Sequence, residues 1–317
     1  MTDRESGTNL GPFLADPHAG PGLDRKAQLH VHTARSRDAR TPALEMLAAY
    51  RSQGFSFVVI TDHDRPGLPP GLPPGPDGGH LAGECLVLPG EEATIPNPFW
   101  PLGPHLLRIL ATRPLRRRRL RRRDARRDLE QALAATAAEG GLCGLAHPGW
   151  RGNLETGLWR PEVVDGLPGI RLIEVWNPHS DTGKDEAFWH REALLRGPEA
   201  PVWASAGDDS HEPGHVGRAW LAVKTPEVSV GAFREALLAG RFYPTTGAEA
   251  AFAVADGSLR VETSPEATIR FVAGQGGVVA EAKGPVAFYR PAGSERFVRV
   301  VVEDAAGKAW SQPFWLR

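Results

Sequence analysis

The stretch Gln28-Leu-His-Val-His-Thr33 places two histidines one residue apart at the end of an apolar run that is typical of a β-strand. Side chains at positions i and i+2 of a strand project from the same face of a sheet. His30 and His32 can therefore offer two imidazoles to one cation. The segment predicts a strand whose end carries metal ligands.

Short apolar runs recur through the first 247 residues, and helical patterns lie between several of them. Strands that alternate with helices favour a mainly parallel sheet or barrel. Seven strands fit a barrel somewhat better than an open sheet, although the pattern alone does not separate the two. The predicted strands are Ala27–His32, Phe55–Thr61, Cys85–Leu88, Leu106–Ala111, Leu142–Ala146, Ile170–Val175 and Val202–Ala206. The predicted helices run from Thr41-Pro42 to Gly54 and over Arg116–Glu139, Asp185–Arg196 and Val230–Ala239.

The two ends of the chain differ from this alternating region, which spans residues 25–247. Residues 1–24 are polar and rich in Gly and Pro, and we expect a flexible N-terminal tail. Residues 248–317 contain no helical pattern, and they predict a small all-β, sandwich-like domain. Its expected strands are Ser258–Glu262, Ala267–Ala273, Gly277–Ala282, Val286–Tyr289, Phe297–Val302 and Pro313–Leu316. The Pro- and Gly-rich segment Gly67–Gly79 predicts a loop near the mouth of the barrel.

Composition excludes several classes of protein. The net charge is −1 and 41% of the residues are hydrophobic, which is ordinary for a globular chain with a sizeable core. Cys85 and Cys143 are too few for a disulfide framework and indicate buried, reduced thiols. No stretch reaches the roughly 20 apolar residues of a membrane helix, and the N-terminus has no apolar signal core. We therefore expect a cytoplasmic protein without membrane contact.

Further histidines and carboxylates stand at or beside the ends of the predicted strands. This pattern mixes nitrogen donors with carboxylates and contains no thiolate, which suits Zn²⁺, Mn²⁺ or Fe²⁺ better than Ca²⁺ or a four-cysteine zinc site. One such residue is commonly only solvated, but recurrence at successive strands indicates a metal centre, since active sites of barrels lie at the carboxyl ends of strands. The residues are Asp62-His63, Glu91-Glu92, His105, His147 and Asp208-Asp209-Ser210-His211.

Taken in order, these motifs resemble those of the polymerase and histidinol phosphatase (PHP) superfamily. The resemblance spans about residues 26 to 215 and implies a distorted (βα)₇ barrel of PHP type, which would extend to Gly247. The segment Arg241-Phe-Tyr-Pro-Thr-Thr-Gly247 and the β-rich tail resemble the carbaryl-hydrolase (CehA/McbA) branch. The motifs are Gln28-Leu-His-Val-His-Thr33, Ile60-Thr-Asp-His-Asp64, Gly90-Glu-Glu-Ala-Thr94, His105, Ala146-His-Pro148 and Gly207-Asp-Asp-Ser-His211.

The resemblance also implies a site for three metal ions. One ion would bind His30, His32, Glu92 and Asp209; a second would share Glu92 and bind His105 and His147; a third would bind Asp38, His63 and His211. Glu92 and Asp209 are preferred to Glu91 and Asp208 because they occupy the acidic positions of the family patterns G-x-E-x-T and G-x-D-x-H. One departure concerns the third ion. Many members place Asp directly after the Ser of the first motif, whereas here Arg37 follows Ser36 and Asp38 comes one residue later.

The expected chemistry is attack of a metal-bound hydroxide on a phosphorus or carbonyl centre. Two or three divalent ions (Zn, Mn or Fe) and no organic cofactor are expected, with Glu92, Asp62 and Asp209 as catalytic candidates. Asp62 either orients His63 or a bound water, or caps a turn, and the sequence leaves both open. The side chains that would bind a small anionic ester are Arg35, Arg40, Arg151, His179 and Arg218.

The leading function is a phosphoesterase that cleaves a phosphate mono- or diester. The first alternative is a carboxylic or carbamic ester hydrolase, which the branch resemblance suggests. The second is a nucleic-acid-processing nuclease, because the segment Arg113–Arg127 contains ten arginines. A solvated helix with acidic neighbours is the favoured interpretation of that segment. The oligomeric state and the role of the β-rich tail stay open.

Overall fold

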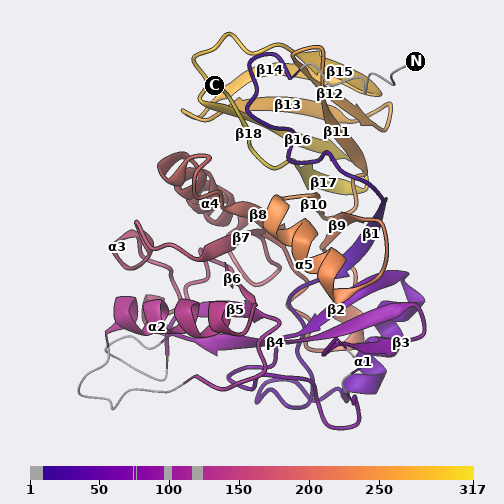
Figure 1. Ribbon diagram of the computed structural model, residues 1–317, viewed down its shortest axis with the longest axis vertical. Helices are drawn as coiled ribbons and strands as arrows, with labels where there is room; N and C mark the ends of the chain where they lie inside the picture. The colour runs from indigo at the N-terminus through magenta and orange to yellow at the C-terminus, as the bar shows by residue number, and fades with distance from the viewer. Residues whose placement is uncertain (1–9, 74, 76, 96–101, 116–123) are drawn as a thin grey trace, which may run out of the picture.

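The computed structural model describes residues 10–73, 75, 77–95, 102–115 and 124–317, and it shows a mixed α/β fold with one large sheet (Figure 1). All seven predicted strands and the four predicted helices have counterparts, although β3, α3, β9 and β10 were not predicted. The elements up to residue 245 are β1 (Leu23–Gln28), α1 (Ala43–Ser52), β2 (Phe55–Ile60), β3 (His80–Ala82), β4 (Cys85–Thr94), β5 (His105–Ile109), α2 (Ala125–Ala138), β6 (Leu142–Leu145), α3 (Pro161–Val164), β7 (Ile170–Trp176), α4 (Thr182–Arg196), β8 (Trp203–Ala206), β9 (Trp220–Thr225), α5 (Val230–Ala239) and β10 (Phe242–Thr245).

The large sheet has mixed strand directions. Its first part runs in the order β8-β7-β6-β5-β4-β2-β1-β9-β10. The pairs β1/β2, β2/β4, β6/β7 and β7/β8 are parallel, whereas β5 is antiparallel to both of its neighbours. The strand pairs among the described residues form an open path from β8 to β10, so the (βα)₇ barrel stays a prediction.

Apolar side chains explain how the helices cover the sheet. The rings of Phe57 on β2 and Phe233 on α5 are stacked with centroids 4.6 Å apart, and both residues are fully buried. Met46, Leu47 and Tyr50 form the buried face of α1. Dense burial of this kind supplies most of the stability of such layers. Among the described helices, none combines the length and the apolarity that a membrane span requires.

The first strand lies earlier in the chain than predicted. It begins at Leu23 and ends at Gln28, so His30 and His32 lie beyond it. The cause is local, because Gln28 Oε1 accepts hydrogen bonds from the N–H groups of Leu29 (2.9 Å) and His30 (3.1 Å). The chain then continues beside the segment that follows β8, where the His32 N–H donates to Ser210 O.

The C-terminal part is all β, as expected, and its strands form two sheets. Strands β17, β16, β13 and β14 extend the large sheet through the pairing of β10 with β17, whereas β11, β12 and β15 form a separate sheet. Both sheets bury one apolar core that includes Phe252, Val261, Phe271 and Val300. The strands are β11 (Ala250–Ala255), β12 (Ser258–Thr263), β13 (Thr268–Ala273), β14 (Val278–Lys283), β15 (Val286–Tyr289), β16 (Phe297–Asp304), β17 (Gly307–Trp310) and β18 (Phe314–Trp315), of which β11 and β17 were not predicted.

Residues 10–24 differ from the expected flexible tail. They run along the C-terminal sheets before entering β1 (Figure 1), and Phe13 is fully buried and bridges Leu316. His18 is also buried, and burial lowers the pKa of its imidazole to about 3. The ring is therefore neutral, and its Nε2 accepts the N–H of Gln312 at 3.1 Å. Apolar side chains at few positions are enough to anchor a segment that is polar on average.

The buried side chain of Gln312 joins the C-terminal part to the first sheet. Its Nε2 donates to Ala204 O on β8 (3.0 Å) and to Phe242 O on β10 (3.2 Å), and its Oε1 accepts the Ala204 N–H (2.8 Å). One amide thus satisfies three backbone groups that have no access to water. Buried backbone groups without a partner are unfavourable.

We therefore expect Gln312→Ala to lower the free energy of unfolding by about 1–3 kcal/mol, the cost of unpaired buried polar groups. Urea denaturation would measure the change. The control is Gln275→Ala, since Gln275 is exposed, and this variant should stay within about 0.5 kcal/mol of the parent protein. Equal stability of the two variants would contradict the role assigned to Gln312.

Candidate metal centre

The predicted metal ligands come from separate segments that meet at one edge of the large sheet. His30 and His32 follow β1, His63 follows β2, His147 follows β6, and Asp209 and His211 follow β8. Glu92 lies within β4. His105 stands at the start of β5, but β5 runs antiparallel to β4 and pairs His105 with Thr94. The amino end of this one strand therefore lies beside the carboxyl ends of the others.

The carboxylate of Glu92 lies at the centre of the cluster and is only 1% exposed. Each of its oxygens faces imidazole nitrogens from different segments. Oε1 lies 3.2 Å from His30 Nε2, 2.8 Å from His105 Nδ1 and 2.9 Å from His147 Nε2, and Oε2 lies 3.2 Å from His32 Nε2 and 3.0 Å from His63 Nδ1. A carboxylate in this position can bridge two cations.

Asp209 completes the first predicted set of ligands. Its Oδ1 lies 3.3 Å from His30 Nε2 and 3.1 Å from His32 Nε2. Burial opposes protonation of His32, but the carboxylates of Asp209 and Glu92 outweigh it and raise the pKa of this imidazole to about 9. Burial would likewise raise the pKa of Glu92, but the imidazoles around it, first that of His105, hold the pKa well below its usual range. The pocket thus holds carboxylates in the ionised form that metal ligation needs.

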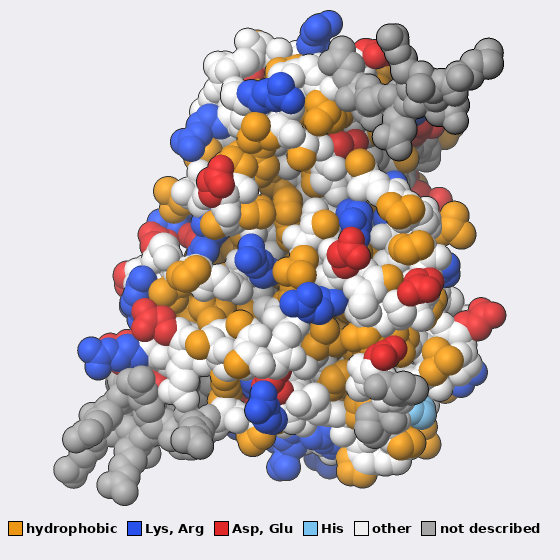
Figure 2. All heavy atoms as spheres, in the orientation of Figure 1, with side chains coloured by type: hydrophobic (Ala, Val, Ile, Leu, Met, Phe, Trp, Pro, Cys, Tyr) orange, Lys and Arg blue, Asp and Glu red, His pale blue; other side chains and the backbone are white. Residues whose placement is uncertain are grey.

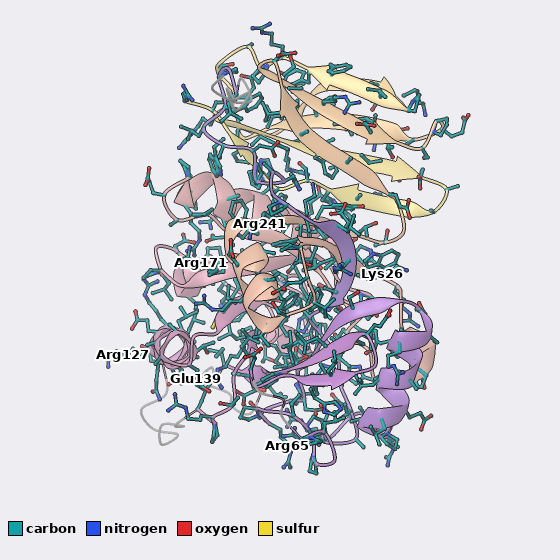
Figure 3. All side chains as sticks on the ribbon, turned by 45° about the vertical axis from the view of Figure 1, so that its right-hand side comes forward. Lys26, Arg65, Arg127, Glu139, Arg171 and Arg241 are labelled. Atoms are coloured by element: carbon teal, nitrogen blue, oxygen red, sulfur yellow. The ribbon has the colours of Figure 1, made fainter. Side chains whose placement is uncertain are left out.

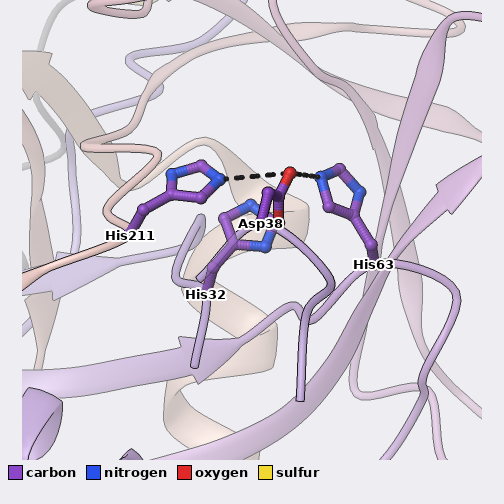
Figure 4. Close-up of side chains that lie close together, drawn as sticks. All are labelled: His32, Asp38, His63 and His211. Carbon is purple, nitrogen blue, oxygen red and sulfur yellow. Dashed lines mark ion pairs between the residues drawn. The ribbon is translucent and has the colours of Figure 1, made fainter. Parts of the chain in front are cut away.

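Asp38 reaches the cluster despite its shifted position in the first motif. Its Oδ2 lies 3.1 Å from His63 Nε2 and 3.6 Å from His211 Nε2, with the His32 ring beside them (Figure 4). The side chain is 46% exposed, so this group of ligands opens toward solvent. The structure therefore brings together the residues of the third predicted set and adds His32 to them.

The second predicted set is grouped differently. The ligand atoms of His63, Glu92 and His105 all lie within 4.8 Å of one another. His147 also contacts Glu92, but it lies outside that group. His63 thus stands between two groups of ligands, which the sequence did not indicate.

The polar atoms in this cluster fit divalent cations. Five side-chain atoms of the ligand residues are buried and have no hydrogen-bond partner among the described residues: His30 Nε2, His32 Nε2, His63 Nδ1 and Glu92 Oε2, which lie within the cluster, and His147 Nδ1. Buried polar atoms normally have partners, so unpaired nitrogen and oxygen lone pairs that converge on one place require an explanation. Imidazole and carboxylate donors without thiolate suit Zn²⁺, Mn²⁺ or Fe²⁺.

Glu174 is a residue of the site that the sequence analysis missed. Its Oε1 accepts the His30 Nδ1–H at 2.9 Å, and its Oε2 accepts the His147 N–H at 2.8 Å and the Asn177 amide at 3.0 Å. The proton on Nδ1 leaves the His30 Nε2 lone pair free for a cation. The available signal was a glutamate between the apolar residues Ile173 and Val175 of β7. Gly207 is required beside it, because a Cβ there would lie 2.7 Å from Glu174 Oε1.

Asp62 lies behind the ligands and holds the loop of the first motif. It accepts hydrogen bonds from the Thr33 N–H (2.6 Å) and from the hydroxyls of Thr33 and Ser36. Ser36 Oγ in turn accepts the His32 Nδ1–H at 2.9 Å and the His63 N–H at 3.0 Å. The contacts of Asp62 thus orient His32 and the backbone at His63 through Ser36.

The acidic neighbours of Glu92 and Asp209 have structural partners. Glu91 forms an ion pair with Arg108, which is fully buried on β5. Asp208 accepts the N–H groups of Gly217, Arg218 and Ala219. Glu91 and Glu92 are successive residues of β4 and so point to opposite faces, whereas the left-handed backbone of Asp209 (φ 47°) separates its carboxylate from that of Asp208.

The candidate substrate-binding residues are placed unequally. The guanidinium of Arg35 is hydrogen-bonded within the protein, because it donates to the carbonyls of Arg65, Pro66 and Gly67. Arg151 forms an exposed ion pair with Glu155. Arg40 and Arg218 are both exposed. The exposed ring of His179 lies 5.9 Å from that of His211, at the edge of a cavity of about 490 Å³.

The arginine-rich segment Arg113–Arg127 is partly outside the described residues, which omit 116–123. Among its described members, Arg113 lies 3.6 Å from Glu139 and Arg126 donates to Asp165 O. Arg127 projects outward from α2 (Figure 3). On the face in Figure 2, acidic and basic side chains are interspersed. Binding of nucleic acid at this segment stays a prediction.

We expect Glu174→Gln to weaken metal binding by about 10–100-fold, the usual effect of changing a partner of a metal-binding histidine. The amide keeps the shape of Glu174, but its single oxygen cannot accept both the His30 Nδ1–H on one side and the His147 N–H and Asn177 amide on the other. Titration of the chelator-treated protein with Zn²⁺ would measure the affinity. The exposed Glu199 provides the control Glu199→Gln, and an equal affinity of the two variants would refute this role.

Three of the solved structures that are similar to this chain have TM-scores between 0.45 and 0.49. One is a two-domain protein containing a predicted PHP-like metal-dependent phosphoesterase from Bacteroides vulgatus, with 14% identity, a TM-score of 0.49, and coverage of 99% of this chain and 100% of the other. PsfC from Pseudomonas syringae has 16% identity, a TM-score of 0.45 and coverage of 68% and 88%. The lesion-specific endonuclease PfuEndoQ from Pyrococcus furiosus has 14% identity, a TM-score of 0.45 and coverage of 68% and 56%.

Comparison with curated proteins gives no match to this chain. The sequence model of the PHP-associated family matches residues 201–242. This segment contains β8, the loop with Asp209 and His211, β9 and α5. The match covers one of the ordered motifs, Gly207-Asp-Asp-Ser-His211, whose Asp209 and His211 side chains are part of the cluster. Residues 201–242 are thus similar to the PHP-associated family, in agreement with the resemblance of the ordered motifs.

Proposed function

We propose that this protein is a metal-dependent phosphoesterase that cleaves a phosphate mono- or diester at a multinuclear site. The observation that carries the proposal is the buried Glu92 carboxylate, which faces five imidazoles. So many ligand-type side chains around one buried carboxylate are difficult to explain as structural residues. The family match supports the same class of enzyme.

The chain offers ligands for two or three divalent ions. His30, His32, Glu92 and Asp209 would hold the first ion; Glu92 and His105 would share the second with His63 or His147; Asp38 and His211 would hold the third with His32 or His63. When bound, such ions lower the pKa of water and stabilise negative charge on the reacting centre. Zn²⁺, Mn²⁺ and Fe²⁺ all suit these donors.

The protein's own groups prepare the site for an anionic substrate. Glu174 and Ser36 fix the His30 and His32 rings, so the ligand atoms are oriented before substrate arrives. His179 and the cavity beside it lie next to His211 and can accept the part of the substrate that leaves. An exposed imidazole there can donate a hydrogen bond to a phosphate oxygen or to the leaving group. Arg40 and Arg218 are the further candidates for contact with the anion.

Removal of metal should abolish activity. We expect two or three equivalents of Zn, Mn or Fe in protein purified without chelators, loss of turnover after chelation, and recovery when the ion is returned. His30→Ala and Glu92→Ala should each lose bound metal and at least about 10²-fold in rate, since metal stabilisation of charge amounts to several kcal/mol. Elemental analysis and a phosphatase assay would measure both quantities.

His80→Ala is the matched control, because His80 lies on β3 and contacts Pro73 O rather than the cluster. It should keep its metal and its rate. Full metal content and full rate in Glu92→Ala would disprove the proposed site.

A panel of phosphate monoesters, phosphate diesters, carboxylic esters and carbamates tests the reaction class on the same sample. Turnover of phosphate esters is expected because several cations close together suit an in-line displacement at phosphorus. Turnover of only carboxylic or carbamic esters would replace this proposal with the CehA-like alternative.

A further inference from the structure

Trp150 lies against two of the imidazoles in the cluster. Its backbone N–H donates to His147 O at 2.9 Å. The ring centroid lies 5.1 Å from that of His105 at an interplanar angle of 34°, and 5.1 Å from that of His147 at 70°. Trp150 thus contacts one imidazole with a tilted face and the other with an edge.

Other imidazoles of the cluster are oriented by hydrogen bonds. The Nδ1–H groups of His30, His32 and His211 donate to Glu174, to Ser36 and to the carbonyl of Asp209. His147 differs, because its Nδ1 is buried and has no hydrogen-bond partner among the described residues. A metal-binding histidine normally has its second nitrogen fixed in this way. Something else must therefore hold the His147 ring.

We propose that Trp150 is a positioning residue that fixes the rings of His105 and His147 by packing, where hydrogen bonds fix those of His30, His32 and His211. The inference rests on the proposed metal-dependent function. Both rings face Glu92 Oε1, so a small rotation of either imidazole would move a ligand atom away from the shared carboxylate. A flat aromatic ring against both imidazoles restricts that rotation.

The loop after Trp150 is built to keep the tryptophan in place. Its chain closes through the Gly157 N–H, which donates to Arg151 O at 3.1 Å. A Cβ at Gly157 would lie 2.2 Å from Trp150 Cε3, so the backbone of Gly157 lies directly against the indole. Gly157 does not adopt a left-handed conformation. The requirement for glycine here is therefore space for the indole ring.

The experiment compares Zn²⁺ binding to chelator-treated protein in five forms: the parent protein, Trp150→Ala, Trp150→Phe, Gly157→Ala and the double variant Trp150→Ala/Gly157→Ala. Trp150→Ala should weaken the binding of one equivalent of Zn²⁺ by about 10–100-fold, whereas Trp150→Phe should keep most of the affinity. Gly157→Ala should resemble Trp150→Ala although it keeps the tryptophan, because the new methyl group displaces the indole. The double variant should be no weaker than Trp150→Ala alone, since removal of the ring makes room for the methyl group.

Leu154→Ala is the control, because Leu154 is 94% exposed in the same loop and should leave Zn²⁺ binding unchanged. Parent affinity for every equivalent in Trp150→Ala would overturn the inference and leave the proposed function intact. Additive losses of Zn²⁺ affinity in the double variant would also overturn it. So would an equal loss of affinity for all equivalents of Zn²⁺ together with lower stability of the metal-free protein. A parent protein that binds no Zn²⁺, Mn²⁺ or Fe²⁺ would refute the proposed function itself, and the inference with it.

Discussion

The Glu92 carboxylate lies buried among five imidazoles, and a buried charge is strongly unfavourable unless opposite charge or hydrogen bonds surround it. This requirement determines which segments must meet, because no single segment supplies enough imidazoles. The chain satisfies it by bringing strand ends from β1, β2, β5 and β6 to one edge of the sheet. The reversed direction of β5 serves the same end, since it presents His105 beside Glu92 rather than at the far edge.

A layer of polar partners behind the ligands gives the cluster its fixed geometry. Glu174, Ser36 and Asp62 are shielded side chains whose hydrogen bonds end on ligand rings or on the adjoining backbone. The two acidic pairs divide their tasks in the same way. Glu91 pairs with an arginine and Asp208 accepts backbone N–H groups, while Glu92 and Asp209 face the imidazoles. Each acidic pair therefore places one carboxylate among the imidazoles and the other against structural partners.

The sequence predicted the presence of the strands because apolar runs are local patterns, but it placed the end of the first strand wrongly, since β1 ends at Gln28 and His30 and His32 lie beyond it. Apolar runs such as Phe55–Ile60 and the spacing of His30 and His32 need no knowledge of distant residues. Contacts between residues far apart in the chain could not be predicted from local pattern. The role of Glu174 depends on its hydrogen bond to His30, and the structure places His63 between two groups of ligands. The packing of residues 10–24 was missed for the same reason, since Phe13 meets Leu316 only in the folded chain.

The amide of Gln312 has a consequence for the order of events during protein synthesis. Its partner Ala204 lies 108 residues earlier in the chain. The ribosome therefore releases β8 and the following ligands, Asp209 and His211, long before the amide that satisfies the backbone of β8 exists. A nascent chain can hold this part of the sheet only loosely. This part of the sheet gains its full set of hydrogen bonds only after the segment that carries Gln312 has been synthesised and has docked against β8 and β10.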